Sequence, residues 1–466
     1  MLSQDQANGL FKKLRRCSRA SDVEVTFTAG RFALTRFANN TILQNVSDES
    51  CEVSVRSVFA GPEGIRTARA GTNKLDDDSL RRAVEASETL ARVQQPEADL
   101  LPMYEPQGDG TVTAVSSRYS EETAAMDAFA RAAEVEKMVA VARREKLNSA
   151  GTFSSGEHVS ALFNSREVER WQRETHAQAS VTMTAADSSG WQKANSTTAG
   201  DLDSASLAEI AAHKALRSAS PREVEAGPCT VILEPAAVLD IVGFMFWDFS
   251  AAALLEERSF LNNRLGQRIF GGNINIVDDV RHPLQTGPGF DGEGVSRQRL
   301  ELVRDGVVQQ VACARASAER WRKSPLAAQH AGMQATGHGF PLPNEMGEAP
   351  VNIVFQLPGG ARPQSVDEIV ASTERGLLVT RLWYIREVDS YEKILTGMTR
   401  DGTFRVEDGR IRYGVRNLRF NESLLHLLNN VSAMSEPVRA SGEESFDMVV
   451  PAMKVEGFNF TEVTRF

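Results

Sequence analysis

Cysteine is scarce in this chain of 466 residues. Cys17, Cys51, Cys229 and Cys313 lie far apart and form no CxxC pair. This spacing argues against a disulfide framework and against a thiolate cage for a metal. The basic N-terminal segment has no apolar stretch behind it, so it does not match a secretory signal. We therefore expect a reducing compartment and predict a cytoplasmic location.

Long apolar runs are also rare. Residues 236–255 approach the length of a membrane span, but they include Asp240 and Asp248. Each charge would cost about 2.5–3.5 kcal/mol at the centre of a bilayer. The sequence therefore predicts a buried helix here and no membrane partner.

The chain has no excess of positive charge. Its 52 basic and 62 acidic residues give a formal net charge of −10, which leaves no broad electrostatic footprint for nucleic acid. With 41% hydrophobic and 24% charged residues, the composition is that of a globular protein. The length is roughly three times the usual ~150 residues of a domain, so two or three domains are expected.

Most motifs that carry chemistry are absent. The chain has no GxxxxGK[ST] loop, no strand-linked GxGxxG and no GxSxG elbow, which argues against nucleotide-driven and α/β-hydrolase chemistry. Ser390 and Lys393 match SxxK, but without the companion motifs that would make the lysine a base. None of the seven histidines has HExxH spacing. His330 and His338 flank a glycine-rich segment and could meet in the fold, although structural histidines are favoured.

The N-terminal region alternates strands and helices. Residues 23–28 and 51–58 alternate in polarity as half-buried strands do, and residues 75–90 form an amphipathic pattern that opens with three aspartates. A proline-rich segment follows and is predicted to be a linker. We expect an N-terminal α/β domain over residues 1–95.

The middle region repeats this mixture. A helix is predicted from Ser120 to about Lys146, followed by strands and by a helix over residues 204–219. Two prolines close this part of the chain. We expect a middle α/β domain over residues 110–220.

The C-terminal region, residues 225–466, is rich in strand patterns. Asp305-Gly306 and Asp408-Gly409 each separate two apolar runs, and Asp-Gly supplies the positive φ values of a type I′ hairpin turn. The predicted fold class is α+β. A mixed N-terminal α/β region precedes a strand-rich C-terminal domain with a large mixed or antiparallel sheet.

Two groups of acidic residues raise the question of catalysis or metal binding. Asp291 and Glu293 lie among glycines and could form a cation site, but a turn that needs glycine conformations is favoured. Asp240, Phe244 and Asp248 share a stripe at i, i+4 and i+8 of a predicted helix over 238–255. The two aspartates could be paired catalytic carboxylates. The favoured interpretation puts the stripe at a solvent-facing or polar edge.

Four segments carry a resemblance to a known family. They are RFANNTILQN at 36–45, GIRTARAGTNKLDDDSL at 64–80, FDGEGVSRQRLELVRDGVV at 290–308 and KVEGFNF at 454–460. In order and spacing they resemble the TldD/PmbA family, also called the modulator of DNA gyrase family or peptidase family U62. The likeness spans nearly the whole chain.

The resemblance implies one of two kinds of subunit. One kind has a zinc-binding HExxxH helix and a later cysteine ligand, and the TldE/PmbA kind lacks them. On that helix Leu239 and Asp240 stand where the first His and the Glu would be, and Phe244 stands at the second His. No zinc is therefore expected in this chain, and the expected set of catalytic, cofactor and metal residues is empty.

The late cysteine ligand is also missing. No cysteine follows Cys313, and the corresponding C-terminal stretch offers only Ser441 and Ser445. A hydrolytic zinc site needs imidazole or thiolate donors and a carboxylate to take the proton of water. The resemblance thus predicts an inactive pseudoenzyme partner in a metallopeptidase family.

The resemblance also implies partners. A TldE-like chain pairs with a TldD-like, zinc-bearing subunit in a heterodimeric metalloprotease that acts on extended or unfolded peptides in proteolysis and peptide maturation. The alternative is a stand-alone homodimer that binds peptides or acts as a scaffold. A third hypothesis, an enzyme with remodelled chemistry, would use Asp240, Asp248, Asp291 or Glu293.

Overall fold

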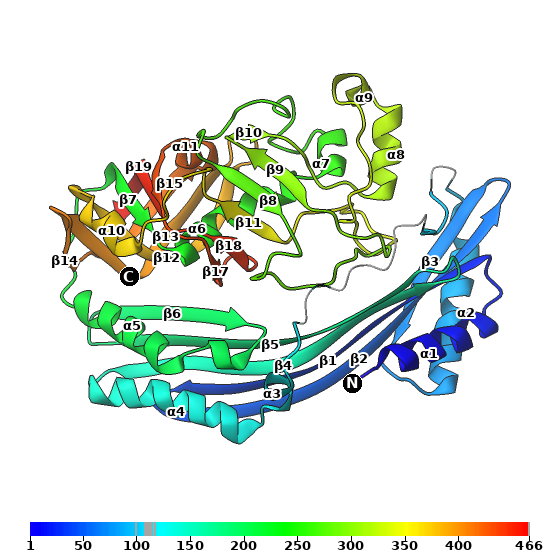
Figure 1. The fold of residues 1–466 in the computed structure, drawn as a ribbon, viewed down its shortest axis with the longest axis horizontal. Helices are drawn as coiled ribbons and strands as arrows, with labels where there is room; N and C mark the ends of the chain where they lie inside the picture. The colour runs from blue at the N-terminus through cyan, green and yellow to red at the C-terminus, as the bar shows by residue number, and fades with distance from the viewer. Residues whose placement is uncertain (98–99, 107–114, 116–117, 465–466) are drawn as a thin grey trace.

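The computed structural model describes residues 1–97, 100–106, 115 and 118–464. A long curved sheet with helices on its outer face lies beneath a strand-rich C-terminal body (Figure 1). The C-terminal body contains two further sheets. The predicted α+β class with a strand-rich C-terminal region is confirmed. Part of the predicted proline-rich linker falls outside the described residues.

The N-terminal sheet is antiparallel throughout, in the order β3-β2-β1-β4-β5-β6. Its strands are β1 Asp22–Ala38, β2 Thr41–Gly61, β3 Gly64–Thr72, β4 Asn148–Asn164, β5 Glu169–Thr184 and β6 Ser189–Ser196. Regions 1–95 and 110–220, which the sequence placed in separate domains, share this sheet because β1 pairs with both β2 and β4. Polarity patterns identify strands but do not say which strands pair.

The strands are longer than their polarity patterns predicted. In β1, Val23, Val25 and Phe27 share one apolar buried face, as their alternation predicts, while Glu24 is buried on the opposite face. β1 and β2 join through Asn39 and Asn40, whose φ values are 50° and 58°. Both values suit a type I′ turn, which asparagine tolerates. This turn was not among the hairpin turns predicted from the sequence.

Helices cover the outer face of the sheet. They are α1 Gln4–Cys17, α2 Asp77–Val93, α3 Glu121–Ala125, α4 Ala128–Arg144, the short 3-10 turn η1 Ala199–Asp201 and α5 Ser204–Arg217. Asp76 caps α2 by accepting the N–H of Ser79 at 2.9 Å. The single helix predicted from Ser120 is instead two, because Asp127 caps a new helix by accepting the N–H of Ala130 at 2.8 Å.

The C-terminal body has two mixed sheets, in the orders β10-β9-β8-β11-β18-β17 and β12-β7-β19-β15-β13-β14, with β16 pairing on β19. The first contains β8 Asn275–Asp278, β9 Leu300–Arg304, β10 Val307–Val308, β11 Ile353–Gln356, β17 Val438–Ala440 and β18 Met448–Val450. The second contains β7 Gly227–Leu233, β12 Arg375–Asp389, β13 Ile394–Glu407, β14 Arg410–Gly414, β15 Leu418–Ser423, β16 Val431–Met434 and β19 Met453–Val463.

The helices of this body are short. They are α6 Pro235–Val242, the 3-10 segment η2 Gly243–Asp248, α7 Ala251–Leu255, α8 Arg315–Lys323, α9 Leu326–Gln329, α10 Val366–Ala371 and α11 Leu424–Asn429. Within the described residues, no helix has the length and apolarity that crossing a membrane requires.

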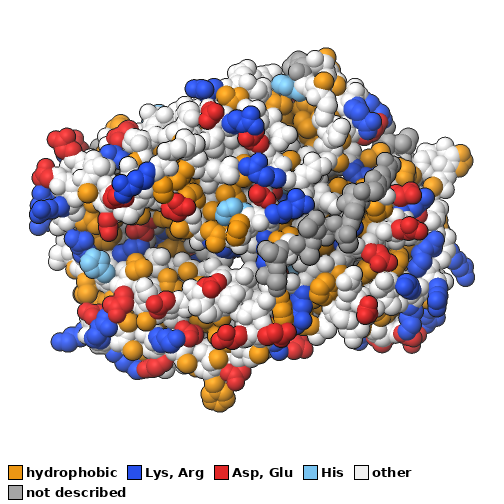
Figure 2. Space-filling model, viewed as in Figure 1, with side chains coloured by type: hydrophobic (Ala, Val, Ile, Leu, Met, Phe, Trp, Pro, Cys, Tyr) orange, Lys and Arg blue, Asp and Glu red, His pale blue; other side chains and the backbone are white. Residues whose placement is uncertain are grey.

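The two predicted hairpins are confirmed. Asp305 and Gly306 have φ values of 49° and 76° between β9 and β10, and Asp408 and Gly409 have 50° and 70° between β13 and β14. Basic and acidic side chains are interspersed over the face shown in Figure 2. That distribution fits the absence of a broad basic footprint in the sequence.

Candidate functional site

The predicted helix over 238–255 is broken into three pieces. α6 begins with Pro235 at its first turn, the 3-10 segment η2 follows from Gly243, and α7 begins after Ser250. The Ser250 hydroxyl caps α7 by accepting the N–H of Ala253 at 3.2 Å. The stripe predicted for one continuous helix therefore does not exist.

Asp240 is fully buried, so its predicted place at a solvent-facing or polar edge is wrong. Its Oδ1 accepts the backbone N–H groups of Glu443 and Glu444, both at 3.1 Å. Its Oδ2 is buried without a hydrogen-bond partner among the described residues. Burial raises the pKa of Asp240 to about 7, although the two backbone donors oppose the shift.

The loop that binds Asp240 also contacts the next residues of this segment. A Cβ built on Gly243 would lie 1.8 Å from the Oγ of Ser445, so the loop packs directly on the backbone there. Phe244 follows and is half-buried. The structure thus places Ser445, one of the two serines of the C-terminal stretch, against the segment that the resemblance equates with the metal helix.

Asp248 is buried and paired. Its Oδ2 lies 2.6 Å from the Nζ of Lys393, which also lies 2.6 Å from the Oε2 of Glu387. Burial raises the pKa of Asp248 even though Lys393 opposes this shift. Lys393 is ion-paired with two carboxylates, so the SxxK match at Ser390 does not supply a free base.

A cavity of about 650 Å³ opens above these residues. It is lined by Gly243, Phe244, Trp247, Asp248, Arg258, Glu387, Ser390, Lys393, Glu444, Ser445 and Phe446. Aromatic rings and ion-paired charges share its wall. We call it the α6–η2 cavity.

The residues at the family's metal positions do not fit zinc. Leu239 and Phe244 offer no donor atom, and Asp240 has one oxygen occupied by two backbone N–H groups. Ser441 and Ser445, the two serines of the stretch where the family's late cysteine is expected, have neutral hydroxyls and no thiolate. Across the described ranges, no group of three or more His, Cys, Asp or Glu side chains is arranged to hold a metal ion.

His338 belongs to a structural network. Its buried ring lies 3.0 Å from the Oδ1 of Asp278 and 3.0 Å from the Oγ1 of Thr336. Burial alone would raise the pKa of Asp278, but Arg297, His338 and backbone N–H groups lower it to about 2. His330 lies after α9 and accepts the indole N–H of Trp321 through its backbone oxygen at 3.0 Å.

Asp291 is engaged within its own glycine turn. It accepts the backbone N–H groups of Glu293 at 2.9 Å, Val295 at 3.0 Å and Gly339 at 2.9 Å. Burial raises its pKa to about 7, and Glu293 adds to the shift. Glu293 itself pairs with Arg315 at 2.9 Å. These contacts agree with the favoured interpretation of a structural turn.

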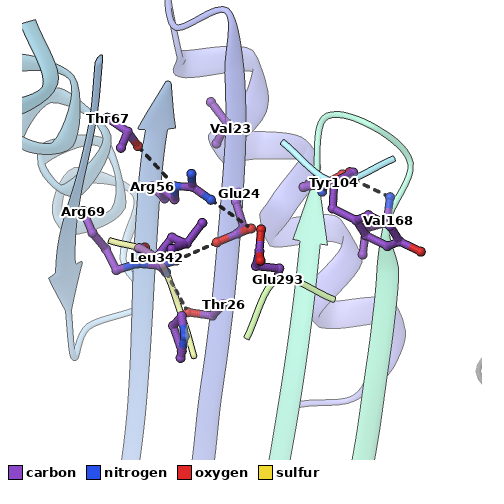
Figure 3. Close-up of polar contacts among 12 residues, drawn as sticks. Val23, Glu24, Thr26, Arg56, Thr67, Arg69, Tyr104, Val168, Glu293 and Leu342 are labelled. Atoms are coloured by element: carbon purple, nitrogen blue, oxygen red, sulfur yellow. Dashed lines mark hydrogen bonds and ion pairs between the residues drawn. The ribbon is translucent and has the colours of Figure 1, made fainter. Parts of the chain in front are cut away.

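A buried charge cluster that sequence reasoning missed lies beside this turn (Figure 3). Glu24 of β1 lies 2.6 Å from Arg69 and 3.7 Å from Arg56, and Arg69 also donates to the backbone oxygen of Leu342 at 2.8 Å. The cluster joins the N-terminal sheet to the C-terminal body. The available signal was a charged residue inside each predicted strand, Glu24 in 23–28 and Arg56 in 51–58.

Two family models match the chain. Residues 226–462 match the PmbA/TldA metallopeptidase C-terminal domain, and residues 23–91 match the PmbA/TldA metallopeptidase domain 1. Among curated relatives, a protein called metalloprotease PmbA from Escherichia coli O157:H7 is 22% identical over 461 residues, covering 94% of this chain and 93% of the relative.

Solved structures share the fold. TldE from Thermococcus kodakarensis superimposes with a TM-score of 0.81 at 16% identity, covering 98% of this chain and 99% of that chain. A putative modulator of a DNA gyrase from Thermotoga maritima gives a TM-score of 0.82 at 19% identity, covering 98% of this chain and 100% of that chain. At these identities the likeness establishes the architecture alone.

Proposed function

Because the chain belongs to the PmbA/TldD metallopeptidase family, we propose that it is the non-catalytic, TldE/PmbA-like subunit of a metalloprotease. Its partner is a TldD-like subunit that holds the zinc, and their shared substrates are extended or unfolded peptides. The chain then contributes to proteolysis or peptide maturation by binding the partner and the peptide.

One observation carries this proposal. The segment that aligns with the family's metal helix presents Leu239, Asp240 and Phe244, and the loop with Ser445 packs against it. The surroundings have adapted to this set of residues, since backbone N–H groups of the loop bind Asp240. Asp240 therefore binds the backbone of this loop, and we propose that it does so where the zinc-bearing subunit binds its metal.

The family resemblance supplies the partner, and two structural features support a binding role. The α6–η2 cavity has aromatic side chains, including the exposed Trp247, which can pack against a peptide. Lys393 is already occupied by Asp248 and Glu387, so the cavity offers shape and apolar contact more than a free reactive group.

The test is an assay with casein as an unfolded substrate. We expect no cleavage by the purified chain alone and a basal rate of cleavage by a zinc-bearing family relative alone. When the two are mixed, we expect cleavage to rise clearly above that basal rate. Fluorescence of labelled casein fragments measures the rate, and a chelator should abolish it because zinc belongs to the partner.

Two results would contradict the proposal. Cleavage of casein by the lone chain in the presence of chelator would point to a metal-free enzyme built on this chain's own carboxylates. Failure to change the rate of any zinc-bearing relative, together with a stable homodimer, would favour the stand-alone binding or scaffold protein.

Zinc content provides an independent prediction. After dialysis against metal-free buffer, we expect well under one zinc per chain by elemental analysis, because the positions of Leu239 and Phe244 supply no ligand. About one zinc per chain would overturn the assignment and direct attention to His330 and His338. A zinc-bearing relative dialysed in parallel serves as the control.

A further inference from the structure

The N-terminal sheet has a long free edge. β3 pairs with β2 only from Val53 onward, whereas β1 pairs with nearly the full length of β2. Residues 41–52 of β2 therefore have a strand on one side only, at the rim of the sheet opposite β6 (Figure 1). All of them are exposed except Val46 and Cys51, which are half-buried. We call residues 41–52 the β2 edge.

The backbone of the β2 edge points hydrogen-bonding groups outward at known positions. Gly61 and Gly64 close the hairpin between β2 and β3, so Gly61 directs its N–H and C=O toward β3. Alternate residues of a strand point their backbone groups the same way, and neither register shifts between residues 44 and 61. Asn45, Ser47 and Glu49 therefore direct their N–H groups away from β1.

The β2 edge lacks two common means of blocking strand addition. It contains no proline and no lysine, and among the described residues no strand or helix pairs with its outward backbone groups. Leu43 is 64% exposed. A long exposed edge of this kind accepts an added strand through main-chain hydrogen bonds.

The charges of the β2 edge are of one sign. Asp48 and Glu52 project on the face that carries Arg56, which is the face toward the C-terminal body, and they form no ion pair among the described residues. Their neighbours across β1 are Phe32 and Thr28. Glu49 projects on the other face, with Arg31 opposite it. Arg31 pairs with Glu157 at 3.4 Å. On the face toward the C-terminal body, Asp48 and Glu52 are therefore two acidic side chains without an ion pair among the described residues.

We propose that the β2 edge binds an extended peptide with basic side chains four residues apart. Added to the edge in either direction, such a peptide places one basic side chain beside Asp48 and the other beside Glu52, because both acids lie on one face at a separation of four. In the antiparallel direction, the peptide residue two positions after the basic residue beside Asp48 lies beside Val46, and an apolar side chain fits there. The inference rests on the proposed function, which makes extended peptides the ligands, and it names their charge pattern and their place.

Two labelled peptides test the charge pattern. The first has nine residues, with lysine at its first and fifth positions, valine at its seventh, and threonine or serine elsewhere; in the second, glutamate replaces both lysines. We expect the lysine peptide to bind the full chain at low salt, measured by fluorescence anisotropy, and the glutamate peptide to bind at least about fivefold more weakly. High salt should reduce the difference, because exposed ion pairs are screened.

Two changes to the protein locate the site. Ser47→Pro removes one outward N–H and should abolish binding, whereas Ser47→Ala keeps that N–H and should bind as the wild type does. The double variant Asp48→Lys with Glu52→Lys should reverse the preference, so that it binds the glutamate peptide better. This swap keeps the test decisive even if Ser47→Pro unfolds the sheet, which circular dichroism would reveal.

Several outcomes would overturn the inference. Equal binding of the two peptides, unchanged preference in the charge-swapped variant, or unchanged binding by a folded Ser47→Pro would each do so. If the wild-type chain sediments as a dimer and Ser47→Pro as a monomer without peptide, a second copy occupies the β2 edge instead. Peptide binding does not require proteolysis, so the casein assay can fail while this binding test succeeds. Equally, the casein assay can succeed while this binding test fails.

Discussion

Lys393→Met is expected to lower the free energy of unfolding by about 3–5 kcal/mol, the usual cost of breaking a buried ion pair from one side. The lysine side chain is 4% exposed and lies 2.6 Å from both Asp248 and Glu387. Methionine keeps the apolar stem but removes the ammonium. Asp248, which is also buried, then has no counter-charge.

Denaturant unfolding followed by tryptophan fluorescence measures this loss. Lys137→Met is the matched control, because Lys137 is 53% exposed and pairs with Glu134 on the surface of α4. That control should change stability by no more than about 0.5 kcal/mol. Adding Asp248→Asn to Lys393→Met should recover part of the loss, because the uncompensated charge is then removed. A loss below about 1 kcal/mol in Lys393→Met would show that water reaches the pair.

Local chemistry predicted the hairpins and the starts of α2, α3 and α5. Asp305-Gly306 and Asp408-Gly409 form turns because only a few residue types accept two positive φ values in succession. The turn therefore depends on two residues that are adjacent in the sequence. Asp76 caps α2 for a similarly local reason. Features set by residues close in sequence were therefore predictable.

Features set by distant residues were not. The sequence placed Asp240 at a polar or solvent-facing edge because charged residues avoid cores unless paired. Its hydrogen-bond donors, Glu443 and Glu444, come from a loop near the end of the chain. Asp248 likewise finds Lys393 through the fold. The prediction of unbroken helix failed at Gly243, where the loop with Ser445 packs on the backbone.

The pairing of strands was the other feature that could not be predicted from the sequence. The polarity of β1 and β2 identified them as strands, yet nothing in one strand's pattern states that β4 joins β1 and fuses two expected domains into one sheet. The Glu24, Arg56 and Arg69 cluster likewise depends on strand pairing, here of β1 with β2 and of β2 with β3, and on the turn at Glu293. The expected set of metal and catalytic residues in this chain, which is empty, stays a prediction for the zinc and casein measurements.

The stability of the protein should depend on the ionisation of Asp240. Its pKa is raised from 3.8 to about 7 in the folded chain, so the folded state favours the protonated carboxyl. A group of this kind contributes most to stability below about pH 4, and the contribution is lost as the pH rises through about 7. Between pH 5 and pH 8 the loss is roughly 2–3 kcal/mol.

Asp240→Asn removes this titration at nearly constant volume. The asparagine oxygen can still accept the N–H groups of Glu443 and Glu444, as the carboxyl does. Relative to the wild type, the variant should therefore gain about 2–3 kcal/mol between pH 5 and pH 8, measured by denaturant unfolding at both values. Asp291, whose pKa is also raised, titrates in both proteins and cancels in the difference.

Activity separates this structural role from a chemical one. If Asp240 only holds the loop of Glu443 and Glu444, the mixture of Asp240→Asn with the zinc-bearing partner should cleave casein within about twofold of the wild-type mixture. A catalytic carboxylate replaced by an amide would lose on the order of 10²-fold or more. A stable variant with that loss, and with no change in the pH dependence of unfolding, would make Asp240 an acid–base group and this chain an enzyme.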